Sequence, residues 1–191
     1  MSPSPQKKPK YTAEQRAKKK GLIIVHTGNG KGKTSAALGV AFRAAGNRMK
    51  VAIIQFIKGK WKYGELESAR QLKNPIEIHQ MGEGFTWDTN NPARDIEKTR
   101  LAWELCKEKM MSGKYEVVIF DEINYVIDYH YLNVKEVIEA LKQKPPLVHV
   151  ILTGRNAKPE LIEIADLVTE MKEIKHPFKE QGILAQRGIE F

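Results

Sequence analysis

One short segment of the chain combines the residue types that bind phosphate. Positions 22–34 read LIIVHTGNGKGKT, so that an apolar run passes into a glycine-rich turn ending in Lys33 and Thr34. Glycines let successive backbone N–H groups curl around an anion, and the positive end of a following helix adds to the attraction. The lysine supplies a mobile charge and the threonine hydroxyl can bind Mg²⁺. The usual pattern has a glycine where Thr27 stands, but the strand–turn–helix context still predicts a phosphate-binding loop.

The second group that could do chemistry is acidic. Residues 117–122 read VVIFDE, an apolar run ending in Asp121 and Glu122. The carboxyl ends of parallel strands share one edge of a sheet, so this pair can reach the magnesium side of the phosphate loop. Together the two segments predict a Mg-nucleotide site. Its nucleotide-binding residues are predicted to be Gly28, Asn29, Gly30, Lys31, Gly32, Lys33, Thr34 and Ser35.

The elements that position these residues follow from short apolar runs alternating with longer segments. Six runs rich in β-branched residues predict strands, and their continuous hydrophobicity is typical of strands covered on both faces. We therefore predict an α/β fold, a single-domain P-loop (RecA-like) fold with a mostly parallel sheet of about six strands and helices on both faces. The predicted strands are 22–25, 51–56, 76–79, 117–120, 147–152 and 167–171.

Helices are predicted at 33–45, 92–112, 134–142 and 159–164. The second of these has Pro92 at its first position and Gly113 after its end, which are the favoured places for these residues. Apolar or small side chains recur in it at spacings of three and four, which predicts one inward stripe. The stripe consists of Ile96, Thr99, Trp103, Cys106 and Met110.

Composition and charge exclude several classes of protein. At 191 residues, with 41% hydrophobic and 29% charged residues, the chain suits one globular domain. A single cysteine excludes an intramolecular disulfide, and the five histidines lack metal-ligand spacing. No apolar run approaches the roughly 20 residues of a membrane span, so we expect no membrane partner and a cytoplasmic protein.

The net charge of +9 is concentrated at the N-terminus. Residues 1–20 hold seven basic side chains and one acidic one, which leaves residues 21–191 nearly balanced at +3. We therefore predict a basic, flexible arm over 1–20, a P-loop domain over 21–191, and no nucleic-acid partner.

The phosphate loop alone leaves the reaction open, because kinases, ATPases, helicases and GTPases share it. The chain has no Asn-Lys-x-Asp segment, which argues against a GTPase, and its balanced body argues against a nucleic-acid motor. An ATPase or small-molecule kinase remains an alternative. Residues 82–88 place Phe85 and Trp87 in a glycine-bounded loop after a strand, where they either face a ligand or anchor the loop.

Several blocks in one order resemble a known family. They are TGNGKGKT at 27–34, QFIKG at 55–59, GFTW at 84–87, Asp121-Glu122, YHYL at 129–132, Thr153-Gly154-Arg155 and KHPF at 175–178. Over about residues 21–191 the chain closely resembles the cytoplasmic ATP:corrinoid adenosyltransferases of cobalamin synthesis and salvage. It departs from them in Ser35, where a second threonine is frequent, and in its Pro- and Lys-rich arm. In relatives the corresponding segment covers the active site.

The resemblance implies transfer of the 5′-deoxyadenosyl group of ATP to the cobalt of a reduced corrinoid, with triphosphate leaving. It implies catalytic roles for Lys33, Asp121 and Glu122, and Mg²⁺, or alternatively Mn²⁺, held by Thr34 and Glu122. Arg43 and Arg155 are further candidates for phosphate contact, and Phe85 and Trp87 for the corrinoid. The implied partners are the corrinoid, a flavoprotein-type reductant for cobalt and a second copy of the chain in a homodimer.

Overall fold

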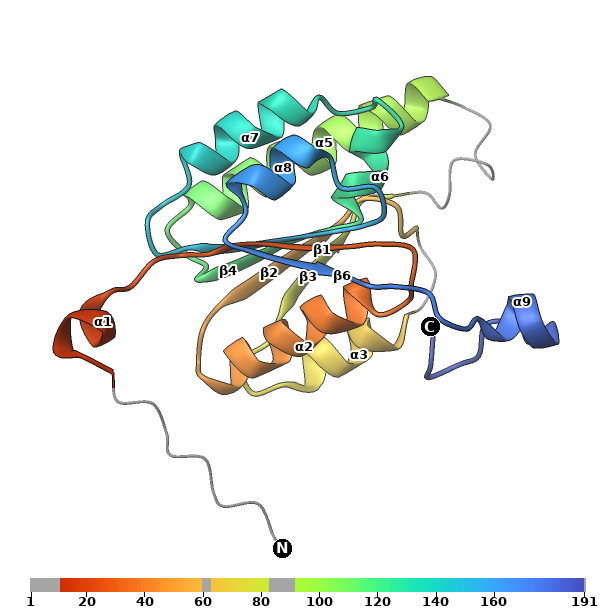
Figure 1. Cartoon of the computed structure of the whole chain (residues 1–191), viewed down its shortest axis with the longest axis horizontal. Coiled ribbons are helices and arrows are strands. Elements are labelled where there is room, and N and C mark those ends of the chain that lie inside the picture. The colour runs from red at the N-terminus through yellow and green to blue at the C-terminus, as the bar shows by residue number, and fades with distance from the viewer. Residues whose placement is uncertain (1–10, 60–62, 83–91, 191) are drawn as a thin grey trace, which may run out of the picture.

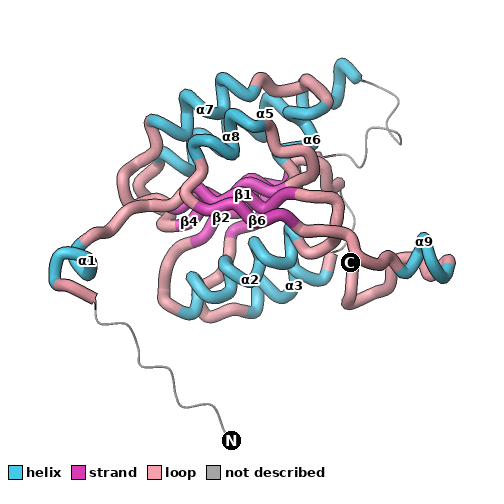
Figure 2. The backbone as a smooth tube through the Cα atoms, viewed as in Figure 1, coloured by secondary structure: helices cyan, strands magenta, loops and turns pink. Residues whose placement is uncertain are grey.

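The structure is a computed structural model, and it describes residues 11–59, 63–82 and 92–190. A layer of strands lies between two layers of helices (Figures 1 and 2). The strands are β1 (Ile23–Thr27), β2 (Val51–Gln55), β3 (Glu77–Gln80), β4 (Val117–Asp121), β5 (His149–Thr153) and β6 (Leu167–Glu170). They form one sheet in the order β3-β2-β4-β5-β1-β6, and every pair is parallel. The predicted α/β class and six-strand parallel sheet are therefore confirmed.

Helices cover both faces of this sheet. One face carries α2 (Lys33–Gly46) and α3 (Gly64–Gln71), and the other carries α5 (Pro92–Met111), α6 (Ile123–Asp128), α7 (Val134–Lys142) and α8 (Pro159–Ile164) (Figure 1). Two short helices, α1 (Ala13–Ala17) and α9 (Pro177–Gln181), lie apart from these layers (Figure 1). None of the helices in the described ranges is long and apolar enough to cross a membrane.

Alternation along the strands divides the core into two clusters. Val25, Phe120 and Leu152 pack against the helices of the α5 face, with Trp103, Cys106 and Met110. Ile24, Ile119 and Ile151 face α2, whose side is lined by small alanines that bring the helix close to the sheet. This close packing holds the first turn of α2 beside the carboxyl ends of the strands.

The inward stripe of α5 is confirmed in four of its five positions. Thr99, Trp103, Cys106 and Met110 are at most 3% exposed. Ile96 was predicted to be buried but is 40% exposed, so this prediction is wrong. It belongs to the first turns of α5, at the outer end of the helical layer (Figure 1), where the helix has less of the domain to pack against.

Candidate active site

The phosphate loop requires glycines for two reasons: its backbone conformation and the close approach of a neighbouring segment. Gly28 and Gly32 have φ of 92° and 107°, a region that side chains disfavour. The segment after β6 passes against the loop, and the Gly30 N–H donates to the Met171 carbonyl at 2.6 Å. A Cβ on Gly28 would lie 2.5 Å from the carbonyl oxygen of Met171. The sequence TGNGKGKT therefore folds as a tight loop after β1, as predicted.

Lys33 lies across this loop. Its Nζ donates to the carbonyl oxygens of Gly28, at 2.8 Å, and Gly30, at 2.6 Å. Burial and the nearby Arg155 lower the pKa of Lys33. The residue also begins α2, and Gly32 at the N-cap offers no side chain to cap the first amides. An ammonium group and a helix N-terminus thus face the same place, which suits an anion.

Asp121 is the centre of a buried hydrogen-bond network at the carboxyl edge of the sheet. Its Oδ1 accepts from the hydroxyls of Thr34, at 2.8 Å, and Thr153, at 2.7 Å. Its Oδ2 accepts from Gln55 Nε2 at 3.2 Å and lies 3.7 Å from Lys58 Nζ. Donors from the loop helix and from two neighbouring strands thus converge on one carboxylate. This arrangement fixes the orientation of the Thr34 hydroxyl, which donates to Asp121.

Lys58 follows β2 and supplies the positive charge of this network. Its Nζ also pairs with Glu65 at 2.7 Å and lies 4.8 Å from the centre of the Tyr63 ring. Burial opposes the charged form, but the carboxylates of Asp121 and Glu65 raise the pKa of Lys58 overall. A lysine ammonium therefore remains beside the acidic pair.

Glu122 differs from its neighbour in having a carboxylate oxygen without a partner. Its φ of 69° places the backbone in the left-handed region, and its N–H donates to the Thr153 hydroxyl at 2.8 Å. Its Oε2 is buried and has no hydrogen-bond partner within the part of the chain that the structure describes. Burial and the adjacent Asp121 raise the pKa of Glu122 to about 8. A buried, unpaired carboxylate oxygen is suited to a bound cation.

The Thr34 hydroxyl and the Glu122 carboxylate are oxygen ligands of the kind that a hard divalent cation binds. Asp121 accepts a hydrogen bond from the Thr34 hydroxyl, so the lone pairs of that oxygen remain available for a cation. Within residues 11–59, 63–82 and 92–190, no three His, Cys, Asp or Glu side chains gather into a metal cage. One hydroxyl and one carboxylate suit Mg²⁺, which keeps several waters and binds substrate phosphates for the rest of its shell. The residues present therefore fit this ion.

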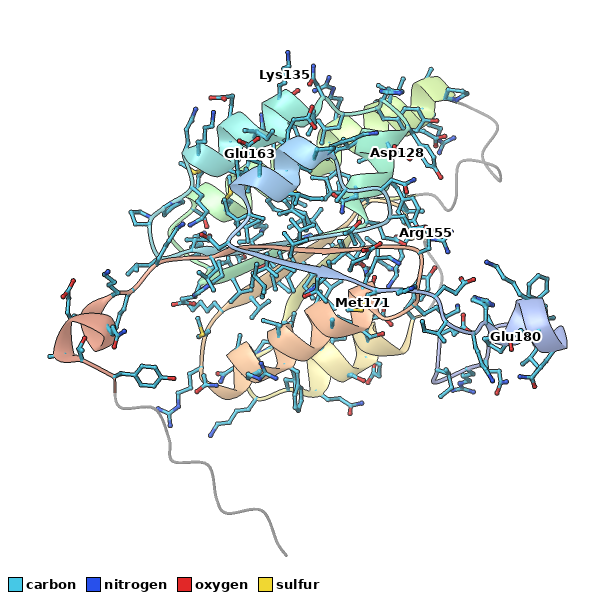
Figure 3. The ribbon with its side chains drawn as sticks, in the orientation of Figure 1. Asp128, Lys135, Arg155, Glu163, Met171 and Glu180 are labelled. Atoms are coloured by element: carbon cyan, nitrogen blue, oxygen red, sulfur yellow. The ribbon has the colours of Figure 1, made fainter. Side chains whose placement is uncertain are left out.

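The remaining predicted phosphate ligands divide into two groups. Asn29, Lys31 and Ser35 are exposed on the loop and on the first turn of α2, and Lys31 pairs with Glu190. Arg155, in the turn after β5, lies at the same end of the sheet as Met171 beside the loop (Figure 3).

Arg43 lies elsewhere. It occupies the last turn of α2, about 15 Å along the helix from Lys33 at 1.5 Å per residue. There it lines a separate hollow of about 180 Å³ together with Met49 and His149. The structure therefore does not bring Arg43 together with the phosphate loop, because ten helical residues carry it to the opposite edge of the sheet.

Three residues of the network lie in blocks that carry the family resemblance, but the sequence predicted no function for them. They are Gln55 and Thr153, each 0% exposed, and Lys58. The signal that would have found the first two is a polar residue at the carboxyl end of an otherwise apolar strand. Phe85 and Trp87 lie outside the described residues.

His26, on β1 directly before the loop, is a buried group that the site does not use. It is 6% exposed, and neither ring nitrogen has a hydrogen-bond partner in the described ranges. Burial lowers the pKa of His26. The folded protein therefore holds the imidazole neutral at a pH where the unfolded chain takes up a proton, so stability present above pH 6.5 should be lost as the pH falls.

We expect His26→Leu to leave the free energy of unfolding at pH 7.5 equal to or above that of the wild type. The reason is that it removes an unpaired buried group whose desolvation costs about 1–3 kcal/mol. Urea unfolding at pH 7.5 and 5.5 should show a smaller acid-induced loss in the variant. His149, whose pKa is also lowered by burial, should keep part of the loss in both proteins. An equal loss of unfolding free energy between pH 7.5 and 5.5 in the variant and the wild type would show that His26 does not cause the pH dependence.

The chain is similar to proteins of one known family. The family described as ATP:corrinoid adenosyltransferase BtuR/CobO/CobP matches residues 19–191. The chain is 49% identical over 174 residues to a corrinoid adenosyltransferase of Sinorhizobium sp, covering 90% of this chain and 81% of the relative. It is 44% identical over 172 residues to that of Pseudomonas aeruginosa, covering 90% and 84%. It is 41% identical over 179 residues to that of Salmonella typhimurium, covering 93% and 89%.

Proposed function

Since this chain belongs to the ATP:corrinoid adenosyltransferase family, we propose that the carboxyl edge of its sheet binds the triphosphate of ATP as a leaving group. The enzyme transfers the 5′-deoxyadenosyl group of ATP to the cobalt of a reduced corrinoid. The observation that carries the proposal is the position of Lys33, whose Nζ lies within 2.8 Å of two loop carbonyls. An anion in the loop would meet this ammonium and the N-terminus of α2 together.

The reaction places few demands on acid–base chemistry. Cobalt(I) is a strong nucleophile whose electron pair forms the Co–C bond at C5′, while the C5′–O bond breaks and its electrons leave with triphosphate. The cobalt is thereby oxidised formally to cobalt(III), and no proton must be removed from the nucleophile. The protein has to align C5′ with the metal, exclude water and stabilise the negative charge of the leaving group. We assign this last task to the loop amides, Lys33 and Arg155.

Mg²⁺, or alternatively Mn²⁺, belongs to the proposal as an ion held by Thr34 and Glu122. When bound, it would neutralise charge on the triphosphate. Asp121 does not need to touch the ion, because its Oδ1 accepts a hydrogen bond from the Thr34 hydroxyl, with the two oxygens 2.8 Å apart, and so orients that hydroxyl. Thr34 and Glu122 provide the ligands, and Asp121 holds Thr34 in place.

The charge state of Glu122 predicts how metal binding depends on pH. The ion requires the carboxylate, whereas the pKa of about 8 keeps Glu122 mostly protonated at neutral pH before the ion binds. The apparent affinity for Mg²⁺ should therefore rise with pH between about 7 and 8 and level off above that range. Half-saturating Mg²⁺ concentrations for turnover, measured from pH 7 to 9 with ATP saturating, would check this. Glu122→Gln should raise that concentration and remove the dependence, whereas a wild-type profile flat from pH 7 to 9 would contradict the assignment.

The corrinoid side of the site rests on the family resemblance. We propose that Phe85 and Trp87 contact the corrinoid, where large apolar rings would displace the lower axial ligand and ease reduction of cobalt(II). The flavoprotein-type reductant and the homodimer remain predictions of the same kind, whereas the basic, flexible arm over residues 1–20 remains a prediction from its charge.

The product distribution tests the proposed function. With ATP, Mg²⁺ and chemically reduced cobalamin, we expect adenosylcobalamin and intact triphosphate in equal amounts. The visible spectrum of the corrinoid would measure adenosylcobalamin, and chromatography of the phosphate-containing products would measure triphosphate. Recovery of ADP with a phosphorylated acceptor would favour the kinase alternative, and ADP with free phosphate would favour the ATPase.

A further inference from the structure

We propose that Thr153, at the end of β5, is a positioning residue that holds both acids of the site in register with the phosphate loop. Its hydroxyl donates to Asp121 Oδ1 at 2.7 Å and accepts from the Glu122 N–H at 2.8 Å. Thr153 is 0% exposed, so no solvent replaces either bond. The proposal rests on the function proposed above and adds to it a residue that touches neither nucleotide nor corrinoid.

The directions of these bonds explain why a hydroxyl is needed. A hydroxyl has one proton to donate and lone pairs to accept, so one oxygen can bond an acceptor and a donor at once. Asp121 offers only acceptors, and the Glu122 amide offers only a donor. Thr34 donates to the same Oδ1 of Asp121 at 2.8 Å. One series of hydrogen bonds therefore links Glu122, Thr153, Asp121 and Thr34 across β4, β5 and α2.

The backbone conformation of Glu122 explains why this series of hydrogen bonds matters for the site. Its φ of 69° is a left-handed conformation that non-glycine residues disfavour. The bond from its N–H to Thr153 opposes relaxation to an ordinary conformation. Without that bond, the backbone turn after β4 could relax, and the Glu122 carboxylate would move relative to Thr34. The expected consequence is weaker binding of the divalent cation, with little effect on the loop itself.

Thr153→Val separates this role from simple packing, because valine has the shape of threonine without the hydroxyl. Thr153→Ser restores the hydroxyl and lacks only the methyl group. Thr169→Val is a matched control, since Thr169 lies at the same level of the sheet on β6, where both threonines are in register with His26. It is two strands away from Thr153.

The measurements are the affinity for a fluorescent ATP analogue in EDTA and in Mg²⁺, the half-saturating Mg²⁺ concentration for adenosylation, and the melting temperature. For Thr153→Val we expect that concentration to rise about 10- to 100-fold, the range found for residues that orient metal ligands. Analogue affinity in EDTA should change less than about threefold, because the loop does not depend on Thr153. Thr153→Ser and Thr169→Val should stay within about threefold of the wild type in all assays.

Three outcomes would overturn the proposal. The first is equal loss of analogue affinity with and without Mg²⁺ in Thr153→Val. The second is a lower melting temperature with unchanged Mg²⁺ dependence, which would mean that the hydroxyl serves stability alone. The third is Thr153→Ser behaving like Thr153→Val. Failure of the proposed function is distinguishable, because a wild type that forms no adenosylcobalamin would still show the metal dependence of analogue binding.

Discussion

Replacing Lys33 with alanine should lower kcat/KM for ATP by about 100- to 1,000-fold, the loss typical of removing one donor that stabilises developing charge. The Lys33 Nζ bonds only the loop carbonyls of Gly28 and Gly30 among the contacts of the described chain, so its removal leaves the core intact. Steady-state adenosylation with chemically reduced cobalamin measures the effect, and circular dichroism checks the fold.

One further variant separates charge from geometry at Lys33, and a second is a control that removes a lysine elsewhere. Lys33→Arg keeps the positive charge but cannot fit the narrow loop in the same way, so we expect activity between those of the wild type and Lys33→Ala. Lys135→Ala removes an exposed lysine of α7, far from the loop (Figure 3), and should leave kinetics unchanged. Unchanged kinetics in Lys33→Ala would show that this lysine does not serve the nucleotide.

Asp121→Asn should abolish most activity and destabilise the fold by about 3 kcal/mol. The two carboxylate oxygens accept from Thr34, Thr153 and Gln55, and Lys58 lies 3.7 Å away. An amide has one oxygen and presents N–H donors in place of the other, so donors would face donors. The expected result is a lower midpoint of urea unfolding and a rate below one hundredth of the wild type's.

The same substitution at Asp128 provides a control for Asp121→Asn. Asp128 also has two partners, Lys158 at 2.6 Å and Asn156 at 2.8 Å, but it is partly exposed and lies outside the network. Asp128→Asn should therefore cost at most about 1 kcal/mol and leave turnover near the wild-type value. Equal losses in the two variants would mean that Asp121 is an ordinary structural aspartate.

Local features of the sequence determined the elements around the site. The helices predicted at 134–142 and 159–164 agree with α7 and α8, because Asn133 caps one and Pro159 begins the other. The phosphate loop could be predicted because its glycines, Lys33 and Thr34 follow one another in the chain. Each of these signals depends on residues within a few positions, and such interactions are already present in a short peptide.

The chain order could not reveal which polar side chains meet. Gln55, Asp121 and Thr153 come from β2, β4 and β5, and they become neighbours only because the sheet has the order β3-β2-β4-β5-β1-β6. The length of α2 separates Arg43 from Lys33, and Ile96 is exposed because it lies in the first turns of α5. The left-handed backbone of Glu122 and the burial of its unpaired Oε2 depend on how segments far apart in the chain pack together. The types of chemical group at the site follow from local sequence, whereas their distances and charge states depend on the packing of strands far apart in the chain.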